Sequence, residues 1–369
     1  MLIRQGYQVN AFLDNSNELI GTLYDGTPIE SPMNYEGTDE LVLITAIGGV
    51  KSAIDNLIRL RISNFASYTD YISHGFLSVS VQTELLIHAH HIKREIEIAA
   101  NHISEDLTLN SIDFVITEKC TMKCHDCANL MQYFEKPQNA DYNMNIRSFD
   151  TLYRLCDWIY EVRVIGGDAM IDPRLSEYLC FLSSYDRISD IIVYTNGIIL
   201  PNETLLNALK DKRISVMITD YGFEKQRLEM VVSSFNTANI PVIIKKVTEW
   251  HNCSRIKSHY YSTEKLKEVL RQCCMSYSPS LKDGKLWRCP SAGSLFALSA
   301  VPQDYNEFVD LLSGKNHANL KQEIVQLMSQ PYLKVCDYCG GRPRINVSPI
   351  PVAVQTDKSL SYDRYSYSS

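Results

Sequence analysis

The stretch CTMKCHDC, residues 120–127, decides the fold. Its three cysteines, Cys120, Cys124 and Cys127, are separated by three residues and then by two. Thiolates are soft ligands that suit zinc and iron–sulfur clusters. A structural zinc site is closed by four ligands, and the ferredoxin spacing C-x2-C-x2-C differs from this one. On a cluster of four irons, three thiolates leave one iron open, which is what catalysis needs.

An alternation of strands and helices surrounds this stretch. Strands are predicted at 111–117, 161–167, 190–196, 214–222 and 240–247, and helices at 148–159, 173–185, 203–212 and 225–235. Because parallel strands need crossovers, the alternation predicts a parallel sheet covered by helices. CTMKCHDC follows the first strand, and the sequences GGD (166–168), TNG (195–197) and DYG (220–222) follow the next three. Ligands bind at the carboxyl ends of such strands, so four loops are expected to converge there.

This arrangement resembles the radical S-adenosylmethionine (SAM) superfamily over about residues 111–247. The resemblance implies an α/β fold with a partial (β/α)6 barrel and a [4Fe-4S] cluster held by Cys120, Cys124 and Cys127. The open iron of that cluster would bind the amino and carboxylate groups of SAM. The residue before the third cysteine is often aromatic in the family, and Asp126 stands there in this chain.

Two further segments resemble motifs of the same family. VRVIGGDAMIDPRL (162–175) is similar to its Gly-Gly-Glu segment, which implies that Gly166 and Gly167 admit the methionine moiety and that Asp168 accepts hydrogen bonds from the SAM amino group. YTNGIIL (194–200) is similar to its third-strand loop, which implies cofactor contacts from Thr195 and Asn196. Each segment alone would read as a turn, and their order carries the interpretation.

A second group of cysteines lies in the region 251–345. It consists of Cys273, Cys274, Cys289, Cys336 and Cys339. This order resembles the twitch domain, a shortened relative of the SPASM domain, and implies an auxiliary [4Fe-4S] cluster. The sequence leaves open whether Cys273 or Cys274 is the ligand, with Cys253 as a weaker substitute, and a structural zinc ribbon is the alternative.

The same region also allows local predictions. A hairpin with its turn at Asp283-Gly284 is expected within 280–290, and helices are expected at 308–314 and 320–333. Cys156 and Cys180 occupy apolar positions of predicted helices, so both are expected to be buried.

The N-terminal region reads as a small α/β unit. GYQVNAFLDNSNELIGTLYDGTPIESP (6–32) resembles the Rossmann-like segment of sugar acyltransferases, although the phosphate loop that should precede Gly6 is missing. The expected organisation is a Rossmann-like domain (1–84), a linker helix (85–110), a radical SAM core (111–250), an auxiliary-cluster domain (251–345) and a flexible tail (346–369).

Composition narrows the partners and the compartment. The chain has 369 residues, a formal net charge of −7 and no basic stripe, so neither nucleic acid nor a membrane is an expected partner. No apolar run has the length of a transmembrane helix or signal peptide, which predicts a cytoplasmic protein. Eleven cysteines in such a chain favour metal or redox chemistry over disulfides.

The functional hypothesis is a radical SAM oxidoreductase or epimerase. A 5′-deoxyadenosyl radical would abstract hydrogen from a small substrate, expected to be a sugar or nucleotide sugar, with the auxiliary cluster as an electron relay and an external donor such as flavodoxin. Asp220, Tyr221 and Lys245, at strand ends, are candidates for catalytic roles. A peptide-modifying radical SAM enzyme and a non-enzymatic zinc-binding protein are the alternatives.

Overall fold

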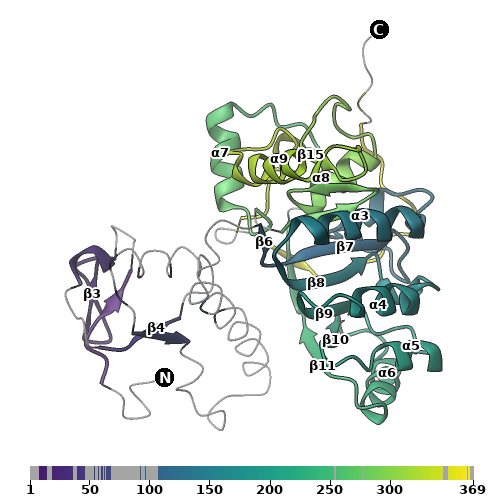
Figure 1. The fold of residues 1–369 in the computed structure, drawn as a ribbon, viewed down its shortest axis with the longest axis horizontal. Coiled ribbons are helices and arrows are strands. Elements are labelled where there is room, and N and C mark those ends of the chain that lie inside the picture. The colour runs from purple at the N-terminus through teal and green to yellow at the C-terminus, as the bar shows by residue number, and fades with distance from the viewer. Residues whose placement is uncertain are drawn as a thin grey trace. The chain divides into compact units, whose positions relative to one another are not determined.

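The structure is a computed structural model, and it divides into two compact units, Met1–Glu105 and Asp106–Ser369 (Figure 1). It describes residues 107–252, 255–276, 278–343, 348–363 and 365, and, nearer the N-terminus, residues 8–14, 19–35, 40–45, 54, 57, 60, 62, 64–67, 92 and 96. In these residues, no helix has the length and apolar character needed to cross a bilayer.

The second unit is built on one nine-stranded sheet. Its strands are β6 (Thr108–Leu109), β7 (Ile112–Thr117), β8 (Trp158–Gly166), β9 (Ile188–Thr195), β10 (Ile214–Asp220), β11 (Val242–Lys246), β13 (Ser280–Lys282), β14 (Lys285–Trp287) and β15 (Phe308–Asp310). Strands β7 to β11 are parallel and lie side by side in chain order. On the other side of β7, the sheet continues through β13, β14 and β15.

Helices and short helical turns connect these strands. They are η5 (Met131–Tyr133), α3 (Tyr142–Leu155), η6 (Ala169–Ile171), α4 (Leu175–Ser183), α5 (Glu203–Ala208), α6 (Lys225–Thr237), α7 (Thr263–Gln272), α8 (Pro290–Ala297), α9 (His317–Ser329) and α10 (Cys336–Cys339). In Figure 1, α3, α4, α5 and α6 lie along one side of the parallel strands. Strand β12 (Glu249–His251) pairs with β16 (Pro349–Pro351) in a separate two-stranded sheet.

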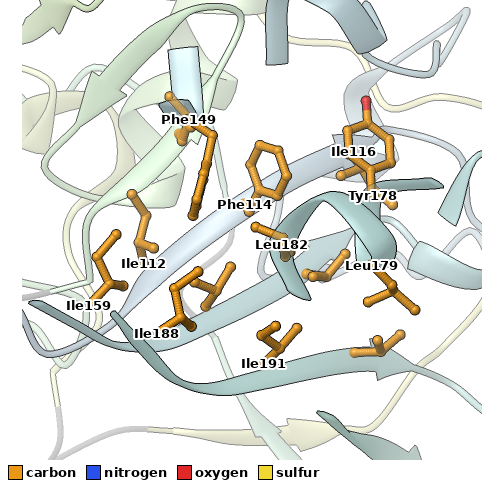
Figure 2. Close-up of a cluster of buried hydrophobic side chains, with 14 of the residues drawn as sticks. Ile112, Phe114, Ile116, Phe149, Ile159, Tyr178, Leu179, Leu182, Ile188 and Ile191 are labelled. Atoms are coloured by element: carbon orange, nitrogen blue, oxygen red, sulfur yellow. The ribbon is translucent and has the colours of Figure 1, made fainter. Parts of the chain in front are cut away.

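The main core lies between the parallel strands and these helices. Alternate residues of β7, which include Ile112 and Phe114, are fully buried on this face, as the period of two in a strand requires. The Phe114 ring lies 5.1 Å from that of Phe149 on α3 and 5.5 Å from that of Tyr178 on α4 (Figure 2). This packing fixes the positions of β7 and β8, and therefore of the loops at their carboxyl ends.

The structure confirms the expected α/β class with a multi-stranded parallel sheet. The described residues hold five strands in the sequential parallel run, where the resemblance implied six. Residues 158–159, expected at the end of a helix, belong to β8, because Ile159 pairs with Ile188 and α3 ends at Leu155. Cys156 is buried as expected at the end of α3, whereas Cys180 is exposed on α4, contrary to expectation.

The prediction for residues 280–290 is confirmed, and the one for 308–314 is wrong. Strands β13 and β14 form the hairpin, with Asp283 and Gly284 at positive φ in its turn. Residues 308–310 form β15 instead of a helix. They pair with β14, where Phe308 lies opposite Trp287 and the two rings are 4.9 Å apart. The helix expected at 320–333 is present as α9, which begins earlier, at His317, and ends at Ser329.

Two expected boundaries look different in the structure. Strands β13 to β15 extend the sheet of the core, so residues 107–252 and the region that follows lie in one compact unit. The segment beyond 346, expected to be a flexible tail, pairs with β12 through β16 and makes defined hydrogen bonds up to Tyr365.

The first unit contains two small sheets in its described residues. Strand β3 (Thr27–Glu30) pairs with β1 (Phe12–Leu13) in parallel and with β2 (Leu23–Tyr24) in an antiparallel hairpin whose turn holds Asp25 and Gly26. Strand β4 (Val42–Ile44) pairs in parallel with β5 (Phe65–Ser67), and Ile54 and Leu57 pack near them. A short 3-10 helix, η2, spans Pro32–Asn34. Most of the expected linker helix lies outside the described residues.

Candidate functional site

The loops after β7 and β8 lie against each other at the carboxyl end of the sheet. The backbone N–H of Gly167 donates to Thr117 O at 3.0 Å, and that of Asp168 donates to Lys119 O at 2.8 Å. A Cβ atom on Gly166 would lie 2.1 Å from Thr117 O, and one on Gly167 would lie 2.3 Å from Lys119 O. Both positions therefore require glycine for the GGD loop to approach the backbone that leads into the cysteine stretch.

The carboxylate of Asp168 ties the loop after β8 to the loop after β9. Its Oδ2 atom accepts hydrogen bonds from Thr195 Oγ1 and from the backbone N–H of Asn196, both at 3.0 Å, and its Oδ1 atom accepts one from Met170 N at 3.0 Å. Burial raises the pKa of Asp168, while the hydrogen bonds from Asn196, Met170 and Thr195 oppose that shift. The GGD and TNG loops are thus joined through one buried side chain.

Asparagine side chains connect these loops to the cysteine stretch. Asn196 Nδ2 donates to Thr121 Oγ1 at 2.8 Å and lies 3.7 Å from Cys120 Sγ. Asn129 Nδ2, just beyond the third cysteine, donates to Gly166 O at 2.9 Å. The structure therefore brings together the three loops that the sequence analysis singled out after β7, β8 and β9.

Of the three cysteines of the stretch, Cys124 is buried, and Cys120 and Cys127 are half-buried. Burial raises the pKa of Cys120 to about 12 and that of Cys124 to about 11, and it also raises the pKa of Cys127. The charges of Cys127 and Cys124 add to the shift at Cys120, so the three sulfur atoms lie close enough to interact. In the described parts of the chain, no three His, Cys, Asp or Glu side chains are grouped to hold a single metal ion.

Asp126, the departure from the family pattern, is engaged in an ion pair. Its Oδ1 atom lies 2.8 Å from Arg255 Nη2, and its Oδ2 atom lies 2.9 Å from His125 Nδ1. Arg255 Nη1 also donates to the backbone carbonyl of His125 at 2.9 Å. The Asp126 side chain is only 10% exposed. Its ion pair with Arg255 attaches the cysteine stretch to the segment that follows β12.

The candidates at the end of β10 lie in two different settings. Burial raises the pKa of Tyr221, and the charges of Cys127, Cys124 and Cys120 add to that shift, so Tyr221 lies near the cysteine stretch. Its ring meets the Trp250 ring edge-on, with the centroids 5.5 Å apart. Asp220 Oδ1 accepts a hydrogen bond from Gly222 N at 2.8 Å, which is the pattern of an Asx turn.

A pocket opens beside these residues, whereas Lys245 lies on an edge strand. The pocket is lined in part by Met122, Asn196, Asp220, Tyr221 and Arg227. Lys245 is exposed on β11, where its backbone pairs with Thr219. Of the three catalytic candidates, Asp220 and Tyr221 line the pocket.

The second group of cysteines is assembled from separate elements. Burial raises the pKa of Cys289 to about 12, with further contributions from the charges of Cys339 and Cys273. The pKa of Cys336 is raised by burial and then by Cys339, Cys289 and Cys273. These four thiols therefore lie near one another, while Cys274 is exposed. Cys253 lies outside the described residues.

Arg342 lies between the two groups of cysteines. Its Nη2 atom donates to Ala128 O, next to Cys127, and lies 3.4 Å from Ser291 Oγ, at the start of the helix that follows Cys289. Its positive charge lowers the pKa of both Cys127 and Cys289 against the effect of burial. One guanidinium thus acts electrostatically on both groups.

Sequence reasoning missed several residues that bind the cysteine stretch to the rest of the chain. Arg255, Arg342 and Gln355 are distant from it in sequence, and no motif marks any of them. Asn129 offered a signal, since a polar side chain two residues after a predicted ligand cysteine is well placed to reach a neighbouring loop.

The curated proteins that the chain resembles in sequence include GTP 3′,8-cyclases. No family model matches the chain. The GTP 3′,8-cyclase of Campylobacter jejuni subsp. doylei is 25% identical over 154 residues, which cover 38% of this chain and 47% of that protein. The GTP 3′,8-cyclase of Alkaliphilus oremlandii is 27% identical over 130 residues, which cover 32% of this chain and 38% of that protein. The chain thus matches less than half the length of these curated relatives.

Solved structures that resemble the chain include two with AdoMet bound. BtrN in complex with AdoMet and 2-DOIA is 15% identical, with 70% of this chain and 99% of BtrN covered and a TM-score of 0.38. A histidine-tagged anSMEcpe with bound AdoMet is 12% identical, with 70% and 93% covered and a TM-score of 0.40.

The ordered motifs and the parallel sheet are accompanied by curated relatives of one class. The cysteine stretch, GGD and TNG follow successive parallel strands and meet at one end of the sheet. The GTP 3′,8-cyclases are radical SAM enzymes. This chain is similar to them over about a third of its length.

Proposed function

We propose that the chain is a radical SAM enzyme, in which Cys120, Cys124 and Cys127 hold a [4Fe-4S] cluster and leave one iron free for SAM. The observation that carries this proposal is the junction of three loops, in which Asp168 and Asn196 link the cysteine stretch to the loops after β8 and β9. The donor set fits the cluster, since it consists of three soft sulfur ligands on one short loop. Ligation by iron would displace the protons that burial keeps on these thiols.

We propose that the neighbouring loops bind SAM. Gly166 and Gly167 would let the GGD loop lie against the backbone that leads into the cysteine stretch, because a side chain at either position would collide with backbone carbonyl oxygens. The backbone of this loop would then face the methionine part. Asp168, Thr195 and Asn196 form a connected polar group beside the cysteines, and Asp168 orients the Asn196 loop through two of its hydrogen bonds. The residues of this group would position the amino and carboxylate groups of the cofactor.

We propose that Cys273, Cys289, Cys336 and Cys339 hold an auxiliary [4Fe-4S] cluster. The mutual influence of these four thiols supports the set and favours Cys273 over the exposed Cys274. Four thiolates would close the coordination, so this cluster would transfer an electron without binding substrate. The twitch-like assignment of this region is part of the same proposal.

We propose that the substrate is a sugar or nucleotide sugar that undergoes oxidation or epimerisation. The sugar assignment rests on the N-terminal segment that resembles sugar acyltransferases, whose Rossmann-like character is also part of the proposal. With the cluster and SAM bound, the site supplies a 5′-deoxyadenosyl radical that abstracts hydrogen. Tyr221 and Asp220, which line the pocket near the cysteines, would contact the substrate or move a proton, and Lys245 is the third candidate for that role.

The test is transfer of deuterium from substrate to cofactor. The reconstituted enzyme would be incubated anaerobically with SAM, a reductant and deuterated sugars, nucleotide sugars, GTP and a precursor peptide. Deuterium in 5′-deoxyadenosine with one sugar or nucleotide sugar supports the proposal, and the product distinguishes a ketone from an epimer. Deuterium from the peptide alone would favour peptide modification, and deuterium from GTP alone would favour the activity for which the curated relatives are named.

The variant Tyr221→Phe tests the role of the hydroxyl at the site. It keeps the ring that packs on Trp250 and removes the only ionisable group of the side chain. If Tyr221 transfers a proton, we expect SAM cleavage to persist while product formation falls at least tenfold. Unchanged product formation would remove Tyr221 from the proposal. The variant Lys245→Met, at an exposed position, applies the same test to the third candidate.

A further inference from the structure

The C-terminal segment 349–362, here called the C-terminal strap, lies along the cysteine stretch. The backbone N–H of His125 donates to Val354 O at 2.7 Å, and the N–H of Thr356 donates to Lys123 O at 2.8 Å. Between these bonds, Cys124 and Gln355 form an antiparallel pair. The middle cysteine therefore sits in a short two-stranded ladder, whose partner strand comes from more than two hundred residues away in the sequence.

The side chain of Gln355 contacts the sulfur of that cysteine. Its Nε2 atom donates to Cys124 Sγ at 3.2 Å and to Ala353 O at 2.6 Å. Its Oε1 atom accepts a hydrogen bond from the backbone N–H of Lys123 at 2.7 Å. Because a backbone N–H can only donate, this last bond fixes which end of the amide is oxygen, and the NH₂ group must face the sulfur.

The strap is anchored on both sides of Gln355 by contacts that do not involve its side chain. On one side, β16 pairs with β12, where Ile350 lies opposite Trp250. On the other side, the N–H of Leu360 donates to Gln132 O at 2.9 Å, and Tyr362 Oη donates to Leu298 O at 2.8 Å. Replacing the Gln355 side chain should therefore leave the course of the strap intact.

Cys124 has a closer side-chain hydrogen-bond donor than its neighbour Cys120. Cys120 Sγ accepts from the backbone N–H of Met122 at 3.4 Å, inside the same loop, and Asn196 Nδ2 lies farther from it, at 3.7 Å. The donor to Cys124 is a side chain at 3.2 Å that a distant part of the chain supplies. Replacing Gln355 by Glu would remove this donor and keep the oxygen that accepts from the backbone N–H of Lys123.

We infer that Gln355 is a positioning residue of the SAM-binding cluster, whose N–H···S bond to Cys124 raises the reduction potential of that cluster. The inference rests on the proposed function of Cys120, Cys124 and Cys127. Hydrogen bonds to the sulfur ligands and the shielding of a cluster from solvent are established determinants of its potential. The reduced cluster carries one more negative charge than the oxidised cluster, so a donor to its sulfur stabilises the reduced form more.

The test is a redox titration of the reconstituted holoenzyme and its variant Gln355→Leu. The midpoint potential is read from the EPR signal that changes when SAM is added, which separates the SAM-binding cluster from a fully ligated one. We expect the reduction equilibrium to shift about tenfold toward the oxidised form, a lowering of about 59 mV for one electron. The control is Gln322→Leu, the same substitution at an exposed position of α9, which should leave the potential unchanged.

The outcomes separate this inference from the proposed function. A SAM-responsive signal with the wild-type potential in Gln355→Leu would overturn the inference and leave the proposed function standing. The absence of any SAM-responsive signal in the wild-type protein would overturn both. Should Gln355→Leu fold poorly, Gln355→Glu keeps the length of the side chain, removes the donor and should lower the potential at least as much.

Discussion

The two groups of cysteines in this protein are built in opposite ways. Cys120, Cys124 and Cys127 lie on one loop after β7 and are held by contacts from the loops after β8 and β9. The second group takes Cys273 from the end of α7, Cys289 from the residue before α8, and Cys336 and Cys339 from α10. The first group is local in sequence, whereas the second exists only after the chain has folded.

The difference corresponds to a difference in proposed chemistry. Three thiols leave one position of a four-iron cluster open, and the pocket beside Asn196 and Tyr221 lies next to that group. Four thiols close a cluster, and Cys289 and Cys336 of the second group lie within the apolar cluster that includes Leu270, Trp287 and Leu333. An open site needs access for a ligand, whereas an electron relay needs only to be near and shielded from water.

The largest expected effect comes from removing one thiol of the first group, Cys120, Cys124 and Cys127, which is here called the open group. The variant Cys124→Ala should lose SAM cleavage entirely, because two thiolates do not hold the cluster that cleavage requires. Cys180→Ala, at an exposed position of α4, is the matched control and should behave as the wild type. The measurement is 5′-deoxyadenosine formed after anaerobic reduction, and cleavage retained in Cys124→Ala would break the distinction between the two groups.

Removing a thiol of the second group, here called the closed group, should have a different result. In Cys336→Ala we expect the iron content to fall from about eight to about four per chain, because one of two four-iron clusters is lost. SAM cleavage should persist while product formation stops, since the electron acceptor is missing. Loss of cleavage together with product would mean that the second group supports the first instead of relaying electrons.

The adjacent pair Cys273 and Cys274 sharpens the assignment of the closed group. Cys273→Ser should lose about four irons per chain, whereas Cys274→Ser should keep all of them, because the charge of Cys273 acts on both Cys289 and Cys336 while Cys274 is exposed. Iron and sulfide analysis after reconstitution measures both variants side by side. The reverse pattern would show that the ligand is the exposed residue of the pair.

A smaller effect is expected at the glycine loop beside the open group. In Gly167→Ala the new Cβ atom would lie 2.3 Å from Lys119 O, so the loop must shift away from the cysteine stretch. SAM binding should weaken by at least about tenfold, or about 1.4 kcal/mol, while the cluster still assembles. Equilibrium binding of SAM to the reconstituted variant provides the measurement, and unchanged affinity would separate the GGD loop from the cofactor.

The smallest effect is expected from the ion pair of Asp126. Its partner Arg255 is 41% exposed, so Asp126→Asn should cost about 1 kcal/mol or less in the free energy of unfolding. SAM cleavage should remain near the wild-type rate, because Asp126 faces Arg255 and His125. Urea unfolding of the variant measures the first effect. A large loss of SAM binding would instead assign Asp126 to the cofactor site.

How much of the structure can be predicted from the sequence depends on whether local residues or distant contacts determine a feature. The strands at 111–117 and 190–196 were predictable because each holds a short apolar run and a distinctive loop follows it. The strand at 308–310 was not, because its apolar pattern also fits a helix and only pairing with β14 decides between the two. Cys180 was misassigned as buried for a similar reason, since the helix face it occupies depends on tertiary packing.

The candidate site shows the same limit. The residues of the GGD and TNG loops were identifiable from their place after strands, and the structure brings them to the cysteine stretch. The contacts of Gln355 and Arg255 with that stretch were not, because they join segments far apart in the chain through single hydrogen bonds or ion pairs. Such contacts leave no periodic pattern for a sequence to carry.

The most direct measurement is the metal content and SAM reactivity of the anaerobically reconstituted protein. We predict about eight irons and a matching amount of sulfide per chain, with one EPR signal that responds to SAM and with 5′-deoxyadenosine formed on reduction. Bound zinc in place of iron, with no 5′-deoxyadenosine, would contradict the account.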